Sequence, residues 1–383
     1  MKPVIMGEGT SQRLQQVKKS VERFVAGAVE PLAAEIRETG IIPDSVIAGA
    51  RELGLFGMII PNGYGGLDLD VAGACTLLEV VGHSCPGLAC LLGVHNCLAV
   101  AIGLLGTGAQ KAKYLPDLAS GGLIGGYALP FGDWSGWPAV TVVEEEKNER
   151  HVLNGVVRWV ANGPVADLVG VVARAPARAG GLPLFYAVEK DYRTCTVGAI
   201  KKLGGLEGFA VSEMVLEEYE VGDGVLQGCQ EGLVKEVLYE ILNICMVGLA
   251  ACWLGAVKRV VKICLAAASQ GDGKMSGAGR RARLNVLSKV HVETEALAGM
   301  VTEVARKLNR GEGAGWEGLA ARVKASEVFI EVTRQAAELL AGIEGKEGDI
   351  LASLRRDADA AAIVGGGNEL IRQVIGKLIA GKG

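Results

Sequence analysis

The chain has 383 residues, half of them hydrophobic and 21% charged, so it can bury a large core and divide into two or three domains. A net charge of −4 and scattered lysines and arginines give no field that favours nucleic acid, and we expect no DNA or RNA partner. Nine cysteines without a C-x-x-C pair, and four histidines without helical spacing, argue against a disulfide framework and a metal site.

The sequence gives two indications of location. The segment Met1–Met6 turns polar too soon for a signal peptide, which favours a cytoplasmic protein. The most apolar stretch, Gly87–Gly106, is interrupted by His95 and Asn96. It therefore predicts a buried core helix and no membrane span.

The first part of the chain has helical periodicity. Residues 11–55 predict a helix that Pro31 ends or bends, then a helix that starts after Pro43 and ends at a C-cap on Gly54. Two further helices are expected at about 70–83 and 87–106. Residues 1–121 are thus predicted to form an α-helical domain.

Strand patterns follow, and residues 122–229 predict a middle antiparallel β domain. The pair Asn154-Gly155 is the strongest short hairpin signal in this part of the chain. The expected strands alternate or run apolar between Gly, Pro and Asn: Val140–Val143, Val156–Val160, Leu168–Ala173, Pro183–Val188 and Met214–Glu218.

Long helical patterns return in the last part, at about 231–270, 281–310, 315–344 and 367–380. Glycine-rich segments separate them. Residues 230–383 are predicted to form a four-helix bundle, so the expected fold class is α+β, with helical domains on both sides of a β domain.

Two glycine-bounded segments carry a resemblance. Gly54-Leu-Phe-Gly-Met-Ile-Ile-Pro-Asn-Gly-Tyr-Gly-Gly66 fits a Gly-Leu-x-Gly-x-x-x-Pro-x-x-x-Gly-Gly signature, and Gly106–Gly121 fits Gly-Thr-x-x-Gln-Lys-x-x-Tyr-Leu-Pro-x-Leu-Ala-x-Gly. With the order of the three domains, nearly the whole chain resembles the acyl-CoA dehydrogenase family. The resemblance implies the fold predicted above.

In that family, two strand-end loops hold the flavin of FAD, and they correspond here to Tyr127–Gly136 and Trp159–Asn162. The resemblance implies flavin contacts at Tyr127, Leu129, Trp159, Ala161 and Asn162. It implies substrate contacts at Ser135, Gly136, Gly365 and Gly366. Several family side chains are replaced: threonines by Pro130 and Ala161, and arginines by Leu206 and Ser269. FAD is therefore expected at an interface with a partner subunit, or lost.

The family's catalytic base is a glutamate, and the corresponding residue is Gly365 when the alignment is anchored on Arg356-Asp357-Ala358. A minority of members carry the glutamate at the position of Asn243, so both positions lack a carboxylate. Glu240, one turn before Asn243, and Glu369, one turn after Gly365, are candidate replacements. A solvated ion pair for Glu240 and a capping role for Glu369 are the more ordinary interpretations.

The resemblance leads to a functional hypothesis. The chain is expected to be a subunit without a base in a heterotetrameric, FAD-dependent enzyme that oxidises an acyl-CoA between Cα and Cβ, in fatty acid or aromatic acid degradation. A related subunit would supply the glutamate, and an electron-transfer flavoprotein would accept the electrons. The alternatives are a self-sufficient homo-oligomeric flavoenzyme with a relocated base and an FAD-free acyl-CoA-binding scaffold. The acyl group stays open.

Overall fold

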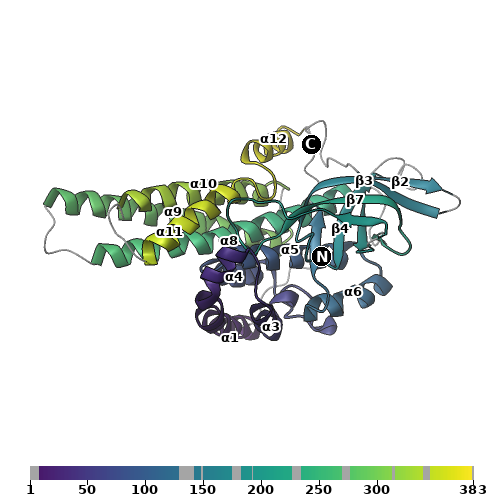
Figure 1. The fold of residues 1–383 in the computed structure, drawn as a ribbon, viewed down its shortest axis with the longest axis horizontal. Helices are drawn as coiled ribbons and strands as arrows, with labels where there is room; N and C mark the ends of the chain where they lie inside the picture. Colours follow the sequence, from purple (N-terminus) through teal and green to yellow (C-terminus); the bar gives the residue numbers. More distant parts are fainter. Residues whose placement is uncertain are drawn as a thin grey trace.

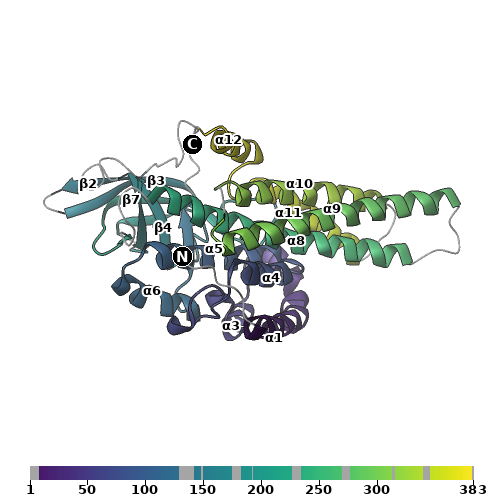
Figure 2. The ribbon, with the colours of Figure 1, turned by 180° about the vertical axis from the view of Figure 1, so that it is seen from behind.

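The computed structural model describes residues 8–128, 142–147, 150–174, 183–191, 193–226, 234–269, 277–312, 315–339 and 346–381. The strands lie at one end of the molecule, and the long helices α8, α9 and α10 extend to the other (Figure 1). The N-terminal helices lie along one side of this axis. Figure 2, the view from behind, shows α12 outside the long helices, near the C-terminus.

The first helical region bends at Pro31 without ending. A π-helical turn at Val25–Val29 and a 3-10 turn at Glu30–Leu32 join α1 to α2, because proline has no N–H and cannot continue the regular α-helical pattern. Gly54 follows α3 with a φ of +70°, as its predicted C-cap role requires. The helices of this region are α1 (Glu8–Phe24), α2 (Ala33–Thr39), α3 (Asp44–Glu52), α4 (Val71–Gly82), α5 (Pro86–Leu105) and α6 (Gly108–Ser120).

The apolar helix α5 is buried inside the fold, as its interrupted sequence predicts. Among the described residues, α5 and the segment Glu236–Ala268 of α8 are long and apolar enough to span a membrane by length and composition alone. In both, 78% of the apolar window is buried inside the protein. Buried core helices are equally long and apolar, so the length and composition of these two helices are explained by their packing inside the protein.

The middle of the chain forms an eight-stranded sheet with the order β6-β7-β3-β1-β4-β5-β8, in which β2 pairs with β3 and β4. Most pairings are antiparallel, but β4 runs parallel to both β1 and β2, so the sheet is mixed. The strands are β1 (Gly125–Ala128), β2 (Val142–Lys147), β3 (Arg150–Ala161), β4 (Leu168–Arg174), β5 (Pro183–Glu189), β6 (Cys195–Val197), β7 (Val211–Glu220) and β8 (Val225–Leu226).

The hairpin predicted at Asn154-Gly155 is wrong. These residues lie inside the long strand β3, where the register against β7 shifts between Leu153 and Gly155. The Asn154 side chain accepts a hydrogen bond from the Glu218 N–H of β7 at 2.8 Å. Pairing with two neighbouring strands therefore overrides the local turn preference and produces a bulge. The polar residues Glu144–Lys147 instead form the end of strand β2, which pairs antiparallel with β3 from Lys147 opposite Arg150.

The C-terminal part contains one helix more than expected. Residues that were predicted to connect two helices form α11, and α12 follows it after a short turn. The helices are α8 (Val234–Ser269), α9 (Gly277–Asn309), α10 (Glu317–Leu339), α11 (Lys346–Ala361) and α12 (Asn368–Ile379). Described helices end at Ser120 and resume at Val234, beside the predicted domain boundaries.

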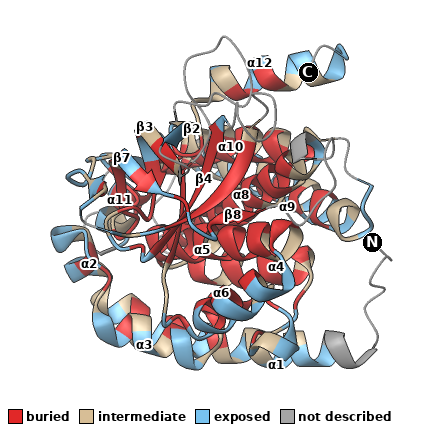
Figure 3. Ribbon diagram, turned by 90° about the vertical axis from the view of Figure 1, so that its right-hand side faces the viewer, coloured by how far each residue is buried: buried red, intermediate tan, exposed pale blue. Residues whose placement is uncertain are grey.

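Burial is concentrated in the inner helices and strands, as Figure 3 shows for α4, α5, α8 and β4. All eight described cysteines are free and buried, in agreement with the expected packing role. Burial raises the pKa of the Cys75 and Cys85 thiols to about 12. Because the thiolate is the reactive form, these thiols are unreactive at neutral pH.

The β domain is anchored on α5 at its first strand. His95 Nδ1 accepts the Gly125 N–H at 2.9 Å, and its Nε2–H donates to the Leu118 carbonyl at 3.0 Å. The Asn162 amide, at the end of β3, donates to the carbonyls of Leu91 and Gly125 at 2.9 and 3.0 Å. Both side chains are buried, so these bonds fix the strand ends against the helical domain.

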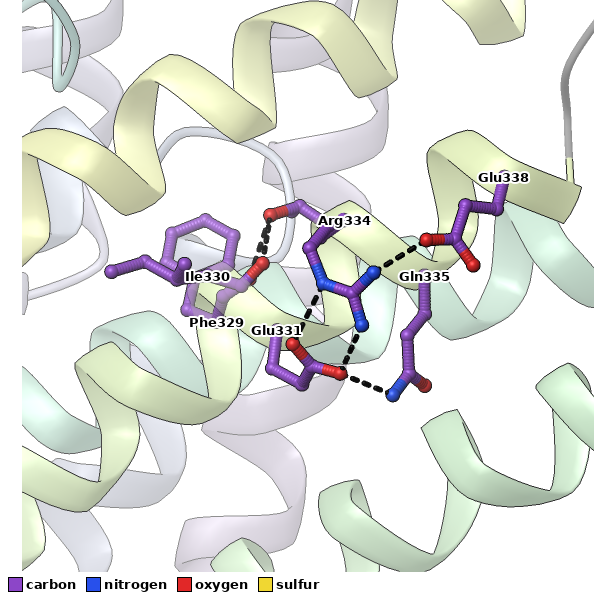
Figure 4. Close-up of polar contacts among 7 residues, drawn as sticks. Phe329, Ile330, Glu331, Arg334, Gln335 and Glu338 are labelled. Carbon is purple, nitrogen blue, oxygen red and sulfur yellow. Dashed lines mark hydrogen bonds and ion pairs between the residues drawn. The ribbon is translucent and has the colours of Figure 1, made fainter.

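The outer face of α10 carries an ion cluster, drawn in Figure 4. Arg334 pairs with Glu331 and Glu338, three and four residues away, and Gln335 also donates to Glu331. Exposed pairs of this kind contribute about 0–1 kcal/mol each. The position of α10 is therefore set by its buried face, which bears Arg322, Ser326 and Phe329.

Candidate functional site

The position expected for the catalytic base lies in a turn between α11 and α12. Gly365 and Gly366 have φ values of +78° and +98°, in the left-handed region where glycine is favoured. A Cβ on Gly365 would lie 3.2 Å from Met246 Cε and 3.3 Å from Leu249 Cδ1 of α8. A side chain here would thus begin against an apolar wall in a strained backbone conformation.

The turn leaves backbone donors open. The Gly366 N–H donates to the Ile363 carbonyl at 3.1 Å, whereas the N–H groups of Gly365 and Gly367 make no hydrogen bond within the described ranges. Gly367 is the N-cap of α12. Free N–H groups at a helix N-terminus favour an oxygen that carries negative charge. The turn thus contains two unpaired donors, and its glycines have no side chain that could accept a proton.

Arg322 of α10 holds both sides of this turn, and the sequence reasoning missed it. Its guanidinium is completely buried and donates to the carbonyls of Ala361 and Val364 and to the Asn368 side chain. Trp253 covers it, with 5.2 Å between the guanidinium carbon and the ring centroid. The only sequence signal was the position of Arg322 on the helix face that carries Ser326 and Phe329.

Burial lowers the pKa of Arg322 to about 9, because the charged form loses its hydration. The carbonyls at the C-terminal end of α11 carry partial negative charge, which offsets part of this cost, and the Trp253 ring adds a cation–π contact. A buried charge maintained in this way rigidifies the turn. Arg322 is therefore a positioning residue for Gly365 and its neighbours.

Asn243, at the second possible base position, has a structural role. Asn243 is 1% exposed; its Nδ2 donates to the Tyr239 carbonyl at 2.9 Å, and its Oδ1 accepts the Gly318 N–H at 2.7 Å. Gly318 lies in the first turn of α10, whose N–H groups have no partner inside the helix. Asn243 thus caps α10 from α8.

The two candidate replacement bases differ in exposure. Glu240 is half-buried on α8, and its carboxylate has no hydrogen bond or ion pair within the part of the chain that the structure describes. Glu369 is exposed in the first turn of α12, where a carboxylate stabilises the positive end of the helix dipole. Its placement therefore agrees with a structural role.

The strand-end residues divide into buried and exposed positions. Tyr127 and Ala161 face each other across β1 and β3 and are buried, with the Tyr127 ring 5.6 Å from that of Phe185. The side chains of Tyr127, Ala161 and Asn162 are therefore buried in the protein interior. Of the predicted flavin contacts, Leu129 lies outside the described residues, as do the predicted substrate contacts Ser135 and Gly136.

Trp159 is the predicted flavin contact that presents a side chain to solvent. It is 40% exposed, and the Lys201 ammonium lies 5.3 Å from its ring centroid. An exposed indole beside a cation fits a planar aromatic ligand that bears negative charge. Leu206, which replaces a family arginine, is buried with a φ of +57°, and its N–H donates to Asp357.

Comparisons with known proteins agree with this geometry. Residues 11–122 match the profile "Acyl-CoA dehydrogenase, N-terminal domain", and residues 236–380 match "Acyl-CoA dehydrogenase, C-terminal domain". The chain belongs to the acyl-CoA dehydrogenase family. The predicted family and fold class are confirmed.

Several relatives cover nearly the whole chain. An acyl-CoA dehydrogenase of Bacillus subtilis is 28% identical over 97% of this chain and 99% of its own length. A very long-chain specific acyl-CoA dehydrogenase of Rattus norvegicus is 27% identical, and the match spans 58% of that longer protein.

Solved structures show the same fold. Butyryl-CoA dehydrogenase from Megasphaera elsdenii has a TM-score of 0.86 at 23% identity, covering 98% of this chain and 99% of that one. PigA in complex with FAD has a TM-score of 0.86 at 19% identity, covering 99% of each chain.

Proposed function

We propose that this chain is a subunit of an FAD-dependent acyl-CoA dehydrogenase that does not itself carry the proton-abstracting carboxylate and acts with a related subunit that does. The observation that carries the proposal is the Gly365 turn. Its left-handed backbone and the apolar wall of Met246 and Leu249 oppose any side chain at the base position. The other base position, Asn243, is used to cap α10.

The chemistry explains why this matters. Oxidation between Cα and Cβ of a thioester removes a weakly acidic α-proton, which requires a positioned base. FAD, when bound, accepts the β-hydrogen as hydride. This chain offers the free N–H groups of Gly365 and Gly367, which favour a thioester oxygen as negative charge develops on it. It can therefore bind and orient an acyl-CoA without taking its proton.

The substrate class and partners rest on relatives. Curated relatives are named as acyl-CoA dehydrogenases, with short-chain and very long-chain members among them, which supports an acyl-CoA as the ligand. A chain of the same fold comes from work on the electron transferring flavoprotein of Acidaminococcus fermentans, and this supports an electron acceptor of that kind. The free described cysteines favour a reducing compartment, and we include the cytoplasm in the proposal.

Reconstitution with a related, glutamate-bearing dehydrogenase chain tests the proposal. We expect the two chains to form one complex by light scattering, and the complex to lose flavin absorbance on addition of an acyl-CoA. The purified chain alone should bind the acyl-CoA without bleaching. Bleaching by the chain alone at the rate of the mixture, or no association between the chains, would refute the proposal.

Glu240 supports a second candidate, a self-sufficient enzyme with a relocated base, because its half-buried carboxylate lies one turn from Asn243. In that case the purified chain bleaches its flavin with an acyl-CoA. Glu240→Gln would then remove bleaching, and Glu369→Gln would serve as the exposed comparison. If bleaching occurs and survives both substitutions, neither carboxylate is the base.

Flavin binding can be tested through Trp159. Trp159→Ala removes the exposed indole at the end of β3, and we expect FAD binding to weaken by roughly 0.5–1.5 kcal/mol, the value of an aromatic stacking contact. Val156→Ala, an exposed change on the same strand, is the control. Equal FAD affinities for the two variants would show that the indole does not contact the flavin.

A further inference from the structure

A cavity of about 350 Å³ lies between α2, the turn that joins α4 to α5, and α11. Its volume falls in the range of small-molecule sites. No residue of the glycine turn or of the sheet's strand ends lines it. Ile36, Ile350 and Leu354 contribute apolar surface to its wall.

Part of the charge around this cavity is neutralised internally. Arg259 of α8 pairs with Glu30 at 2.8 Å, and the Ser84 hydroxyl donates to the same carboxylate at 2.7 Å. Burial, together with nearby cations, lowers the pKa of His83 to about 4, so its ring is neutral at pH 7. None of these groups leaves an uncompensated charge.

The remaining charges are mainly negative. Three carboxyl groups line the cavity in addition to Glu30, and one further cation, Arg37, opposes them. These carboxyl groups belong to Glu207, Asp349 and Asp357. An excess of carboxylates disfavours an anionic ligand and favours a cationic one.

Two polar side chains on α11 are buried at the cavity with unused hydrogen-bonding capacity. Asp357 is 5% exposed and Ser353 is 6% exposed, and they lie one helical turn apart. One Asp357 oxygen accepts the Leu206 N–H at 2.6 Å. The other oxygen and the Ser353 hydroxyl have no hydrogen bond to any residue that the structure describes. Neither atom is sealed from solvent, so both are open to the cavity, where a ligand can replace water as their partner.

The surroundings of Asp357 oppose its ionisation. Burial raises the pKa of its carboxyl to about 7, and the nearby Glu207 acts in the same direction. Arg356 and Arg37 act in the opposite direction, and the Cys85 thiol near it is un-ionised. A cation beside the free oxygen would remove this penalty, which makes cation binding and ionisation of Asp357 mutually favourable.

We propose that this cavity binds a small organic cation, a primary ammonium group on a short alkyl chain. The ammonium donates to the free Asp357 oxygen and to the Ser353 hydroxyl, and the alkyl chain packs on Ile36, Ile350 and Leu354. A bare metal ion fits less well, because no cluster of three His, Cys, Asp or Glu ligands exists among the described residues. The proposal is independent of the function proposed above.

A titration of the purified chain with three probes of equal length, n-butylamine, n-butanol and n-butyrate, tests the proposal by ligand-detected NMR. We expect n-butylamine to bind in preference to the other two. Its affinity should rise as the pH passes upward through about 7, where Asp357 ionises. No binding of n-butylamine, or equal binding of n-butanol, would overturn the proposal.

Three substitutions on α11 locate the binding. Asp357→Asn keeps an oxygen for the Leu206 N–H but removes the charge, and it should weaken n-butylamine binding roughly tenfold or more. Asp359→Asn, an exposed change on the same helix, should leave binding unchanged. If Asp357→Asn fails to fold, Ser353→Ala serves as the test variant, and it should weaken n-butylamine binding by a smaller factor. Unchanged binding in a folded Asp357→Asn or Ser353→Ala variant would place the amine elsewhere.

Discussion

Replacing Gly365 by alanine should destabilise the protein by about 1.5–3 kcal/mol. An L-residue in the left-handed region costs about 1–2 kcal/mol, and the φ of Gly365 is +78°. The added Cβ would also meet Met246 Cε at 3.2 Å and Leu249 Cδ1 at 3.3 Å, closer than ordinary contact, and both side chains are buried. Alanine also reduces the conformational entropy of the unfolded chain, and this effect stabilises the folded protein by only about 0.4–1 kcal/mol.

Urea unfolding followed by circular dichroism measures this loss. Gly367→Ala is the matched control two residues away, because Gly367 has a φ of −60° and no atom within 4 Å of a built Cβ. It should change stability by at most about 0.5 kcal/mol. Similar losses in the two variants would refute the reasoning. Met246→Ala combined with Gly365→Ala should show favourable coupling, since the truncated side chain no longer meets the new methyl group.

Three further substitutions test contacts described above. Asn243→Leu leaves the buried Gly318 N–H without an acceptor and should cost about 1–3 kcal/mol in urea unfolding; no loss would show that α10 does not depend on this cap. Arg322→Ala leaves the Ala361 and Val364 carbonyls without their donor and should lower the free energy of unfolding by about 3–5 kcal/mol. A loss below about 1 kcal/mol would show that the turn does not depend on Arg322. Burial lowers the pKa of His95 to about 4, so the unfolded chain binds a proton first and stability falls as the pH drops from 6.5 towards 4, by up to about 1.4 kcal/mol per pH unit. His95→Gln should lose this contribution and keep the similar one from His83, whose pKa is also lowered to about 4.

Local signals predicted the helical regions well. The helix end at Gly54 depends on a few neighbouring residues, which a sequence displays directly. Helix α6 was not predicted as a separate helix, although Thr107 and Gln110 form a capping box at its start. The Asn154-Gly155 signal failed because β3 is paired on both sides, and the energy of that pairing exceeds a local turn preference. Helix α11 was missed because Lys346–Ala361 is rich in charged residues and its apolar positions are mostly alanine.

The candidate site shows the same division. The absence of a carboxylate at Gly365 and Asn243 is visible in the sequence. What replaced it is not, because the bonds of Arg322 to Ala361 and Val364, and of Asn243 to Gly318, join helices far apart along the chain. Such contacts depend on tertiary packing, which no local pattern specifies.

The cap that Asn243 places on α10 links position 243 to the stability of the helical bundle. A Cβ on Gly318 would lie 2.3 Å from the Asn243 carbonyl oxygen, so the two helix backbones approach closely at this point. A glutamate at position 243 would have to fit its longer side chain into this contact and still accept the Gly318 N–H in place of Asn243 Oδ1. A carboxylate there would therefore serve both as the cap of α10 and as a proton acceptor, so an engineer who introduced it would have to adjust the start of α10 as well.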